Sequence, residues 1–315
     1  LPLTRGGAPI RIGAERSIIK RKILLFQYFD MPQTLSSQSQ QVIKDYLHLP
    51  FPEKNISCPY FNNRRSRVRG ALGVLIGKGT QEEIVDEATL IAMREKIDLK
   101  NLNDEETKKF LVEHNLGVDC SGLVYHVLNA ELNARKLGAL RKHIKRPWIK
   151  SPLRKLITLL RPAENTGVNT FYNNINTKEI KLSEIQTGDL IIMMNTGANH
   201  SLHHVLLVHE VQLIPRNEVT RDLSMEKNVE KQHISVQERI NSGKDSSLAT
   251  LVRNIGYTHS FQYPDDGLYN HGVRQEKIEI TDPNKNLLEQ NWSEPKMREY
   301  AKTAKEIKIK RLKIL

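Results

Sequence analysis

The sequence predicts an α+β fold in which a cysteine-bearing helix packs on a β-sheet. The helix is predicted because apolar residues after Cys120 recur on one helical face, at Leu123, Val124, Val127, Leu128 and Leu132. The sheet is predicted from apolar, strand-like segments further along the chain, beginning with residues 190–193 and 203–211. Together these patterns indicate one helix with a buried face and a set of strands to cover it.

Cys120 is predicted to lie in the first turn of this helix. Asp119 is a favoured residue at the position that begins a helix. Free backbone N–H groups and the positive end of the helix dipole gather in that turn and stabilise a thiolate. We therefore expect the pKa of Cys120 to lie below ~8.5, the ordinary value for cysteine. The alternative is a buried structural thiol.

Further elements follow from the same kinds of pattern. Residues 81–95 and 104–114 are predicted as amphipathic helices, the second capped by Asn103 or Asp104, and residues 153–160 form a short helix. Besides the two strands above, strands are predicted at residues 254–261, 273–280 and 307–312.

The domain organisation is predicted as an N-terminal extension, residues 1–50, followed by one main domain, residues 51–315. An apolar patch at residues 18–26 is expected to pack on the main domain, and the polar residues 34–41 are interpreted as a linker. Insertions are expected at about 78–114, 135–180 and 213–250, the last of them rich in charge and poor in large apolar residues.

The net charge of +12 is unevenly distributed over the 315 residues. Ten lysines and arginines, and no acidic residue, lie between Arg135 and Arg161. Such a surface attracts anionic wall polymers, lipid headgroups or nucleic acid. No zinc-finger spacing or RNA-binding aromatic motif accompanies the charge, so a sequence-specific nucleic-acid reader is not predicted.

The two cysteines, Cys58 and Cys120, are too few for a disulfide framework or a multi-cysteine zinc site. No apolar run approaches the ~18–20 residues of a membrane span. The chain begins at Leu1 rather than methionine, so a preceding signal peptide, and with it the localisation, stays open.

A cysteine hydrolase needs a thiolate, a base that moves its proton, and a group that orients the base. The chain supplies these types in order: Cys120 at a helix start, His203 and His204 at the start of one strand, and His259 in the next. A helix-borne cysteine followed by histidines on strands is the order found in papain-like enzymes. Backbone N–H groups of the first helical turn would meet the oxyanion.

Three motifs in this order resemble the NlpC-type papain-like cysteine peptidases, which are cell-wall hydrolases. The motifs are Asp-Cys-Ser-Gly-Leu-Val at residues 119–124, Gly-Asp-Leu-Ile at 188–191, and His-Val-Leu-Leu-Val at 204–208. The resemblance implies an α+β papain-like domain, with the nucleophile helix packed on an antiparallel sheet and helical insertions.

The resemblance also implies roles for individual residues. Cys120 would be the nucleophile, His204 the general base and His259 the polar residue that orients the base. Tyr60, in a Pro-Tyr pair, resembles a tyrosine that lies over the site and contacts substrate or oxyanion, while Asp119 and Ser121 would help bind the substrate's amino group. The family's glycine-rich stretch after the tyrosine is replaced here by Phe61-Asn62-Asn63, which bears on substrate identity.

Several assignments stay open at this point. His203 and His204 alternate along a strand, so either could face the helix, and His271 and His233 are alternatives to His259. Cys58 is interpreted as structural. The histidines at 200, 203, 204 and 209 lack a carboxylate-rich third element, so neither a metal nor a cofactor is predicted.

The predicted function is hydrolysis of peptide or amide bonds, in peptidoglycan stem peptides, through a Cys–His dyad and a thioester. One alternative is another thiol-dependent acyl transfer by a deamidase, transpeptidase or intracellular amidase. The other is a catalytically inactive basic scaffold that binds nucleic acid or membrane. Peptidoglycan as substrate would imply an exported or cell-envelope protein, with an anionic polymer on the basic surface between Arg135 and Arg161.

Overall fold

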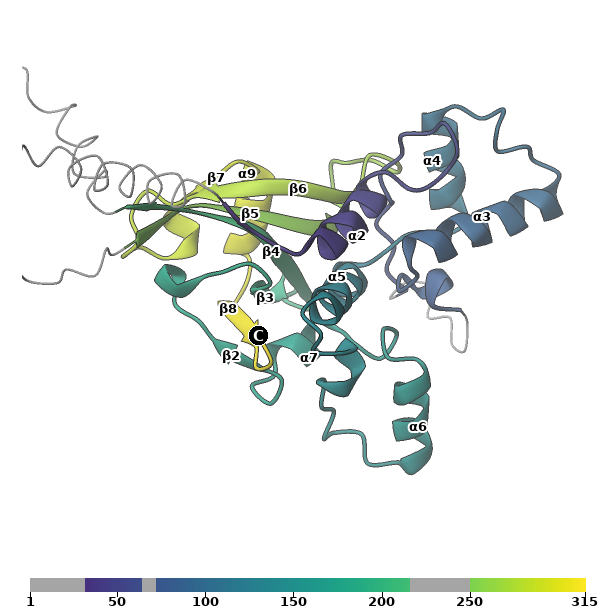
Figure 1. Ribbon diagram of the computed structural model, residues 1–315. Coiled ribbons are helices and arrows are strands. Elements are labelled where there is room, and N and C mark those ends of the chain that lie inside the picture. The colour runs from purple at the N-terminus through teal and green to yellow at the C-terminus, as the bar shows by residue number, and fades with distance from the viewer. Residues whose placement is uncertain (1–31, 64–71, 216–249) are drawn as a thin grey trace, which may run out of the picture. The chain divides into compact units, whose positions relative to one another are not determined.

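The computed structural model describes residues 32–63, 72–215 and 250–315 (Figure 1). The predicted apolar patch at 18–26, His233 and most of the predicted insertion at 213–250 lie outside these residues. The chain divides into two compact units, one of residues 33–211 and 252–315, the other of residues 1–32 and 212–251. In the second unit, the described residues are Pro32 and the strand ends at 212–215 and 250–251.

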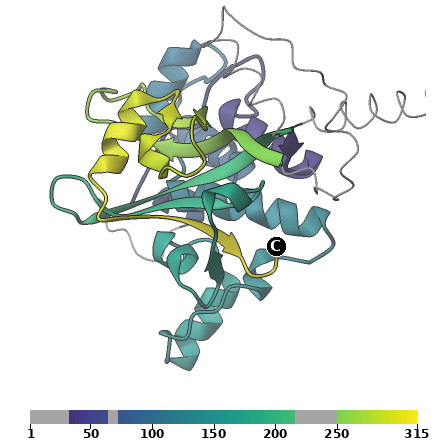
Figure 2. The same cartoon turned by 90° about the vertical axis from the view of Figure 1, so that its left-hand side faces the viewer.

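The described strands form one sheet in the order β2-β8-β3-β4-β5-β6-β7, with β1 paired to β4. Their bounds are β1 (Gln33–Thr34), β2 (Thr177–Glu179), β3 (Leu190–Thr196), β4 (Leu202–Pro215), β5 (Thr250–Phe261), β6 (Gly272–Glu279), β7 (Asn291–Trp292) and β8 (Glu306–Leu312). The pairings of β3 with β4 and β8, and of β5 with β6, are antiparallel. In Figure 2 the C-terminal strand β8, in yellow, runs alongside the earlier strands. The α+β class and the antiparallel sheet are therefore confirmed.

Helices come mostly from the first half of the described chain. Their bounds are α2 (Ser37–Leu47), α3 (Gln81–Glu95), α4 (Asp104–Glu113), α5 (Cys120–Ala134), α6 (Pro152–Leu160), α7 (Val168–Tyr172) and α9 (Pro295–Lys302). Short 3₁₀ turns occupy Gly73–Ile76, Leu140–Lys142, Leu182–Glu184 and Leu287–Glu289. Reciprocal side-chain and backbone hydrogen bonds cap α3 at Thr80 and α4 at Asn103, which satisfies their first N–H groups. No described helix has the length and apolarity to cross a bilayer.

Helix α5 has the buried face that its sequence predicts. Its five predicted stripe residues are fully buried. They share one core with alternate residues of β3 and β4, including Leu190, Ile192, Val205 and Leu207. This packing seats the N-terminal end of α5 against the sheet and so places Cys120 beside β4.

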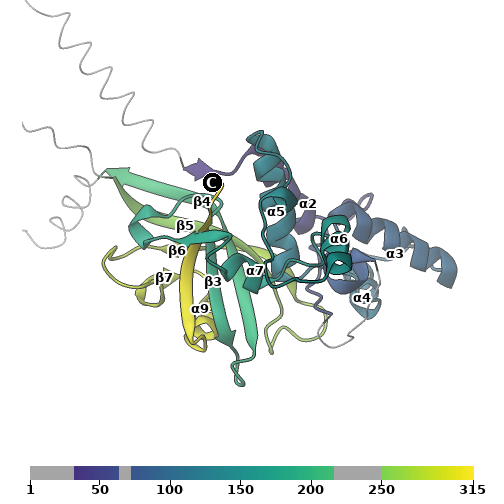
Figure 3. The same cartoon turned by 90° about the horizontal axis from the view of Figure 1, so that it is seen from below.

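The interpretation of residues 34–41 as a linker is wrong, because most of them form the start of α2. Ser36 caps this helix, and the buried hydroxyl of Ser39 donates to the Val127 carbonyl of α5 at 3.3 Å. Ile43 and Tyr46 bury the apolar face. Helices α2 and α5 lie side by side next to the sheet (Figures 1 and 3). The domain boundary at residue 50 stays a prediction.

Candidate active site

The segment before α5 joins three distant parts of the chain. Val118 forms isolated bridges with Tyr60 on one side and Lys78 on the other. Its N–H donates to the Pro59 carbonyl at 3.0 Å. A Cβ on Gly117 would lie 2.4 Å from that carbonyl oxygen, so only glycine allows this approach. Tyr60 and Lys78 are thereby brought to the start of α5.

Cys120 is the first residue of α5. Asp119 caps the helix by accepting the Gly122 N–H at 2.6 Å, as predicted. The expected low thiol pKa is wrong: burial, and then the negative charge of Asp119, raise the pKa of Cys120 to about 12. The charge of Lys78 and the backbone N–H groups of Val205 and Ser121 favour the thiolate, but they do not offset the loss of water.

Cys120 lines a cavity of about 340 Å³ between α5, β4 and the end of α9. His203 and His204 enter it from β4, Tyr60 from the loop before α3, and Tyr300 from α9. The predicted nucleophile, the predicted base and the predicted tyrosine therefore share one cavity, although they come from three separate segments.

A hydrogen-bonded series runs away from this cavity through buried side chains. Nε2 of His204 lies 3.1 Å from Nδ1 of His259, and Nε2 of His259 lies 3.0 Å from Oε2 of Glu294. His204 is on β4, His259 on β5, and Glu294 immediately precedes α9. All three are buried. The two histidines that the sequence predicted are hydrogen-bonded to each other. The third residue of the series, Glu294, was not predicted.

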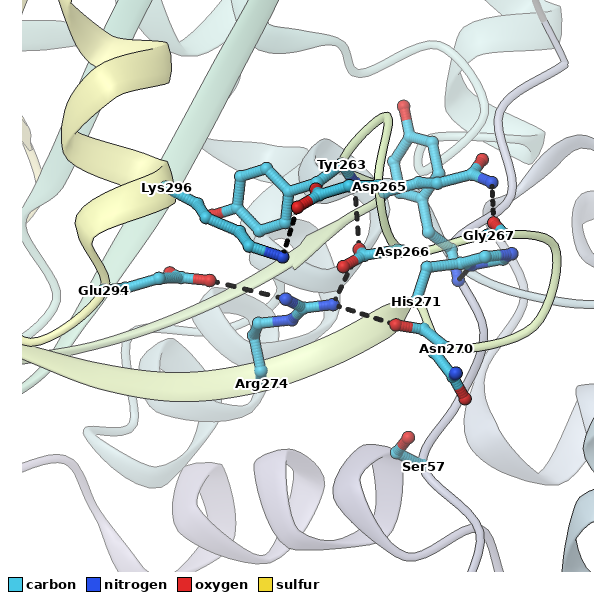
Figure 4. Close-up of polar contacts among 12 residues, drawn as sticks. Ser57, Tyr263, Asp265, Asp266, Gly267, Asn270, His271, Arg274, Glu294 and Lys296 are labelled. Carbon is cyan, nitrogen blue, oxygen red and sulfur yellow. Dashed lines mark hydrogen bonds and ion pairs between the residues drawn. The ribbon is translucent and has the colours of Figure 1, made fainter.

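Glu294 is held from its other side. Its Oε1 accepts from Nη1 of Arg274 at 3.4 Å, and Arg274 also pairs with Asp266 at 3.0 Å (Figure 4). The Tyr257 hydroxyl donates to Oε2 at 3.2 Å. Burial raises the pKa of Glu294, but the hydrogen bond with His259 and the charge of Arg274 outweigh it and hold that pKa below its usual value. Glu294 is therefore an ionised carboxylate.

The two adjacent histidines of β4 have different partners. His203 accepts the Asn195 N–H through Nδ1 at 3.0 Å, whereas His204 pairs with His259. Burial, and then the neighbouring His259, lower the pKa of His204 well below its ordinary value, so this imidazole is neutral. Among the hydrogen bonds of the described residues, none joins Cys120 to His204.

Lys78 is a site residue that the sequence did not predict. Its buried ammonium donates to Oδ1 of Asp119 at 2.8 Å, to Oγ of Ser121 at 2.5 Å and to the Thr166 carbonyl at 3.0 Å. Asp119 and Ser121 were expected to hold a substrate amino group. Here both bind an ammonium that belongs to the chain itself.

Replacement of Lys78 with methionine is expected to destabilise the fold by about 3–5 kcal/mol, because it leaves Asp119 as an unpaired buried charge. Urea unfolding measures this loss. The Lys302→Met variant breaks an exposed pair with Glu299 and is the control, with an expected loss below about 1 kcal/mol. Equal losses in the two variants would contradict the role of the buried pair.

The remaining candidates lie as follows. The Tyr60 hydroxyl accepts from Asn62 at 3.1 Å, and its backbone N–H donates to Nδ1 of His271 at 3.1 Å. His271 therefore holds the tyrosine loop. His209 bonds Thr258, and His200 is exposed. Within the described ranges, no group of three or more His, Cys, Asp or Glu side chains could hold a metal ion.

Comparison with known proteins adds one match. The NlpC/P60 family model matches residues 105–239, which confirms the resemblance seen in the sequence. The matched segment contains Cys120 and His204 and ends before His259 and Glu294. No curated protein and no solved structure matched the chain significantly.

Proposed function

From the NlpC/P60 match and the contents of the cavity, we propose that this protein is a cysteine hydrolase of peptidoglycan stem peptides. NlpC/P60 proteins are in general cysteine peptidases or amidases of the cell wall. The observation that carries the proposal is the series His204–His259–Glu294, which ends at the cavity that Cys120 lines. Such a series beside a cavity is an arrangement that can orient a catalytic base and set its protonation.

The carboxylate of Glu294 sets the proton positions along the series. Because it only accepts, the Nε2 of His259 carries a proton and its Nδ1 is left as an acceptor. Nε2 of His204 then donates to that Nδ1. In a neutral His204, the proton on Nε2 leaves Nδ1 unprotonated, and Nδ1 is the nitrogen that would take the thiol proton.

The reaction starts from a neutral thiol and a neutral imidazole, as the two pKa directions require. The proposed mechanism requires His204 and the thiol to come within hydrogen-bond reach in the substrate complex. The sulfur then attacks the amide carbonyl as Nδ1 takes its proton, and the imidazolium gives that proton to the leaving amine. Water, deprotonated by His204, releases the acyl group from the thioester. We infer that the Cys120 N–H and the Tyr60 hydroxyl, which belong to residues lining the same cavity, donate to the oxyanion.

Lys78 bears on which substrates enter. Since its ammonium already bonds Oδ1 of Asp119 and Oγ of Ser121, we expect that cleavage does not require a free amino terminus at that position. Stem peptides with a free and with an acetylated amino terminus are expected to be cleaved at similar rates.

The test of the proposed function is mass spectrometry of products from purified peptidoglycan, synthetic stem peptides and matched glutamine-containing peptides. Fragments cut within the stem peptide support the proposal. Ammonia release from glutamine without peptide cleavage would identify a deamidase, and joined peptides would identify a transpeptidase. Either result would contradict the proposed reaction.

Replacement of Glu294 with glutamine is expected to lower kcat by about 10²-fold, because an amide no longer fixes the proton positions of the two histidines. The pH profile of kcat/KM is the second readout, and its acid limb is expected to move. Arg274→Gln removes the cationic partner of Oε1 of Glu294, leaves the His259–Glu294 hydrogen bond in place, and is the matched control. If both variants lost activity only in proportion to their loss of folding stability, this positioning role would be contradicted.

A further inference from the structure

Helix α6 turns its apolar face away from the protein. Leu153, Leu156, Ile157 and Leu160 recur at i, i+3, i+4 and i+7 and so form one stripe. Each of these side chains is between 41% and 72% exposed. A helix of a globular protein ordinarily buries such a stripe, so its exposure indicates an interaction surface.

The opposite side of α6 faces the protein. Thr158 is its buried residue, and its hydroxyl donates to the Lys155 carbonyl within the helix. Ser151 caps the first turn, and Pro152 occupies a position where its missing N–H costs nothing. Figures 1 and 2 both show α6 extending away from the sheet. The helix is therefore built to form with its apolar stripe outward.

Positive charge and an aromatic ring surround the stripe. Arg154 and Lys155 lie on α6 outside the stripe, and both are exposed. Lys150 and Trp148 are exposed just before the helix. The whole segment from Arg135 to Arg161 contains no acidic residue. An apolar stripe bordered by cationic side chains and a tryptophan is the pattern of a helix that lies in a lipid–water interface.

We propose that this α6 surface, defined as Trp148, the stripe and the exposed cations Lys150, Arg154 and Lys155, docks the protein on an anionic lipid bilayer. Charge complementarity favours a bilayer over a second copy of this chain as the partner of the α6 surface. Two copies that met through this surface would bring like charges together. The helix would lie in the headgroup region and not cross the membrane. The segment that follows α6 lines the Cys120 cavity through Thr166 and Gly167, so docking would hold that cavity near the membrane surface.

The experiment is co-sedimentation of the full chain with phosphatidylcholine vesicles that either contain or lack phosphatidylglycerol. Binding to the anionic vesicles is expected to exceed binding to the neutral ones by about tenfold and to weaken with salt. The double variant L156E/I157E is expected to lose about tenfold in partitioning, since it places charge on the stripe. The variant R154Q/K155Q is expected to bind more weakly and with less dependence on salt.

The matched control is M93E/L268E, which changes two exposed apolar residues outside this surface. It is expected to bind vesicles like the unchanged protein, and thermal unfolding checks that all variants fold. Equal binding by L156E/I157E and the unchanged protein would overturn the proposal. The proposal would also be overturned if the unchanged protein were a dimer and L156E/I157E were the one variant that is a monomer. The proposal would also be overturned if the protein bound a soluble anionic wall polymer as tightly as it binds vesicles, and if L156E/I157E did not weaken that binding.

Discussion

A Cys120→Ala variant is expected to lose stem-peptide cleavage by a factor of about 10³ or more, because no other group in the cavity forms the acyl-enzyme. The cavity is also lined by hydroxyl-bearing residues, namely Tyr60, Ser121, Thr166, Ser201 and Tyr300. The Ser121 hydroxyl is bonded to Lys78 and Asp119, whereas Cys120 is the first residue of its helix and has backbone N–H groups directed at its sulfur. Product formation under substrate excess, followed by mass spectrometry, measures the loss.

The matched control for this variant is Cys58→Ala. Cys58 is buried, does not line the cavity, and its N–H donates to the Tyr46 carbonyl at 2.8 Å, which a substituted side chain leaves intact. Its activity is expected to stay within about threefold of the unchanged protein, with a stability loss of about 1 kcal/mol from the vacated volume. Activity that survives Cys120→Ala but not Cys58→Ala would reverse the assignment of the nucleophile.

A His204→Ala variant is expected to lower kcat/KM by about 10³-fold or more, because the thiol then has no base and the leaving amine no acid. His203→Ala is the control, since that neighbour lines the same cavity but bonds the Asn195 backbone. It is expected to change kcat/KM by less than about tenfold. A larger loss in His203→Ala than in His204→Ala would make His203 the base.

The lowered pKa of His204 also predicts a pH dependence. A buried neutral imidazole resists protonation in the folded state, while the unfolded chain takes up that proton below ~6.5. Its effect on stability is therefore absent above pH ~6.5, and stability falls as the pH drops below that value. Urea titrations from neutral to acid pH check this, and His204→Gln is expected to remove part of the slope. A slope unchanged by this substitution would contradict the buried neutral form.

The sequence predicted those parts of the fold whose patterns are local. Helix α3 has the bounds that were predicted from its amphipathic pattern, and α5 begins at Cys120 because Asp119 caps it. The strands β3, β4, β5, β6 and β8 each contain a predicted apolar segment. Helix α2 was missed because its first residues are serines and glutamines, which show no apolar pattern. The hydrogen bond of Ser39 to Val127 is a tertiary contact that a local pattern does not reveal.

The parts of the site that depend on tertiary contacts were not predictable from local patterns. Lys78 follows a glycine at the end of a short turn, and its role depends on Asp119 and on the distant Thr166 carbonyl. Glu294 lies before α9 in a segment without a motif, and β6 places Arg274 beside it. The thiol pKa was predicted from the helix start alone, whereas burial by the cavity walls decides its direction.

The central claim is that the sulfur of Cys120 is acylated by a stem peptide with the help of His204. The most direct measurement is intact and peptide-level mass spectrometry after reaction with a stem peptide whose scissile amide is replaced by a thiol-reactive vinyl sulfone. We expect one adduct, on Cys120, that does not form in Cys120→Ala and forms much more slowly in His204→Ala. An adduct on Cys58, or an unmodified Cys120 in protein that still cleaves the parent peptide, would contradict it.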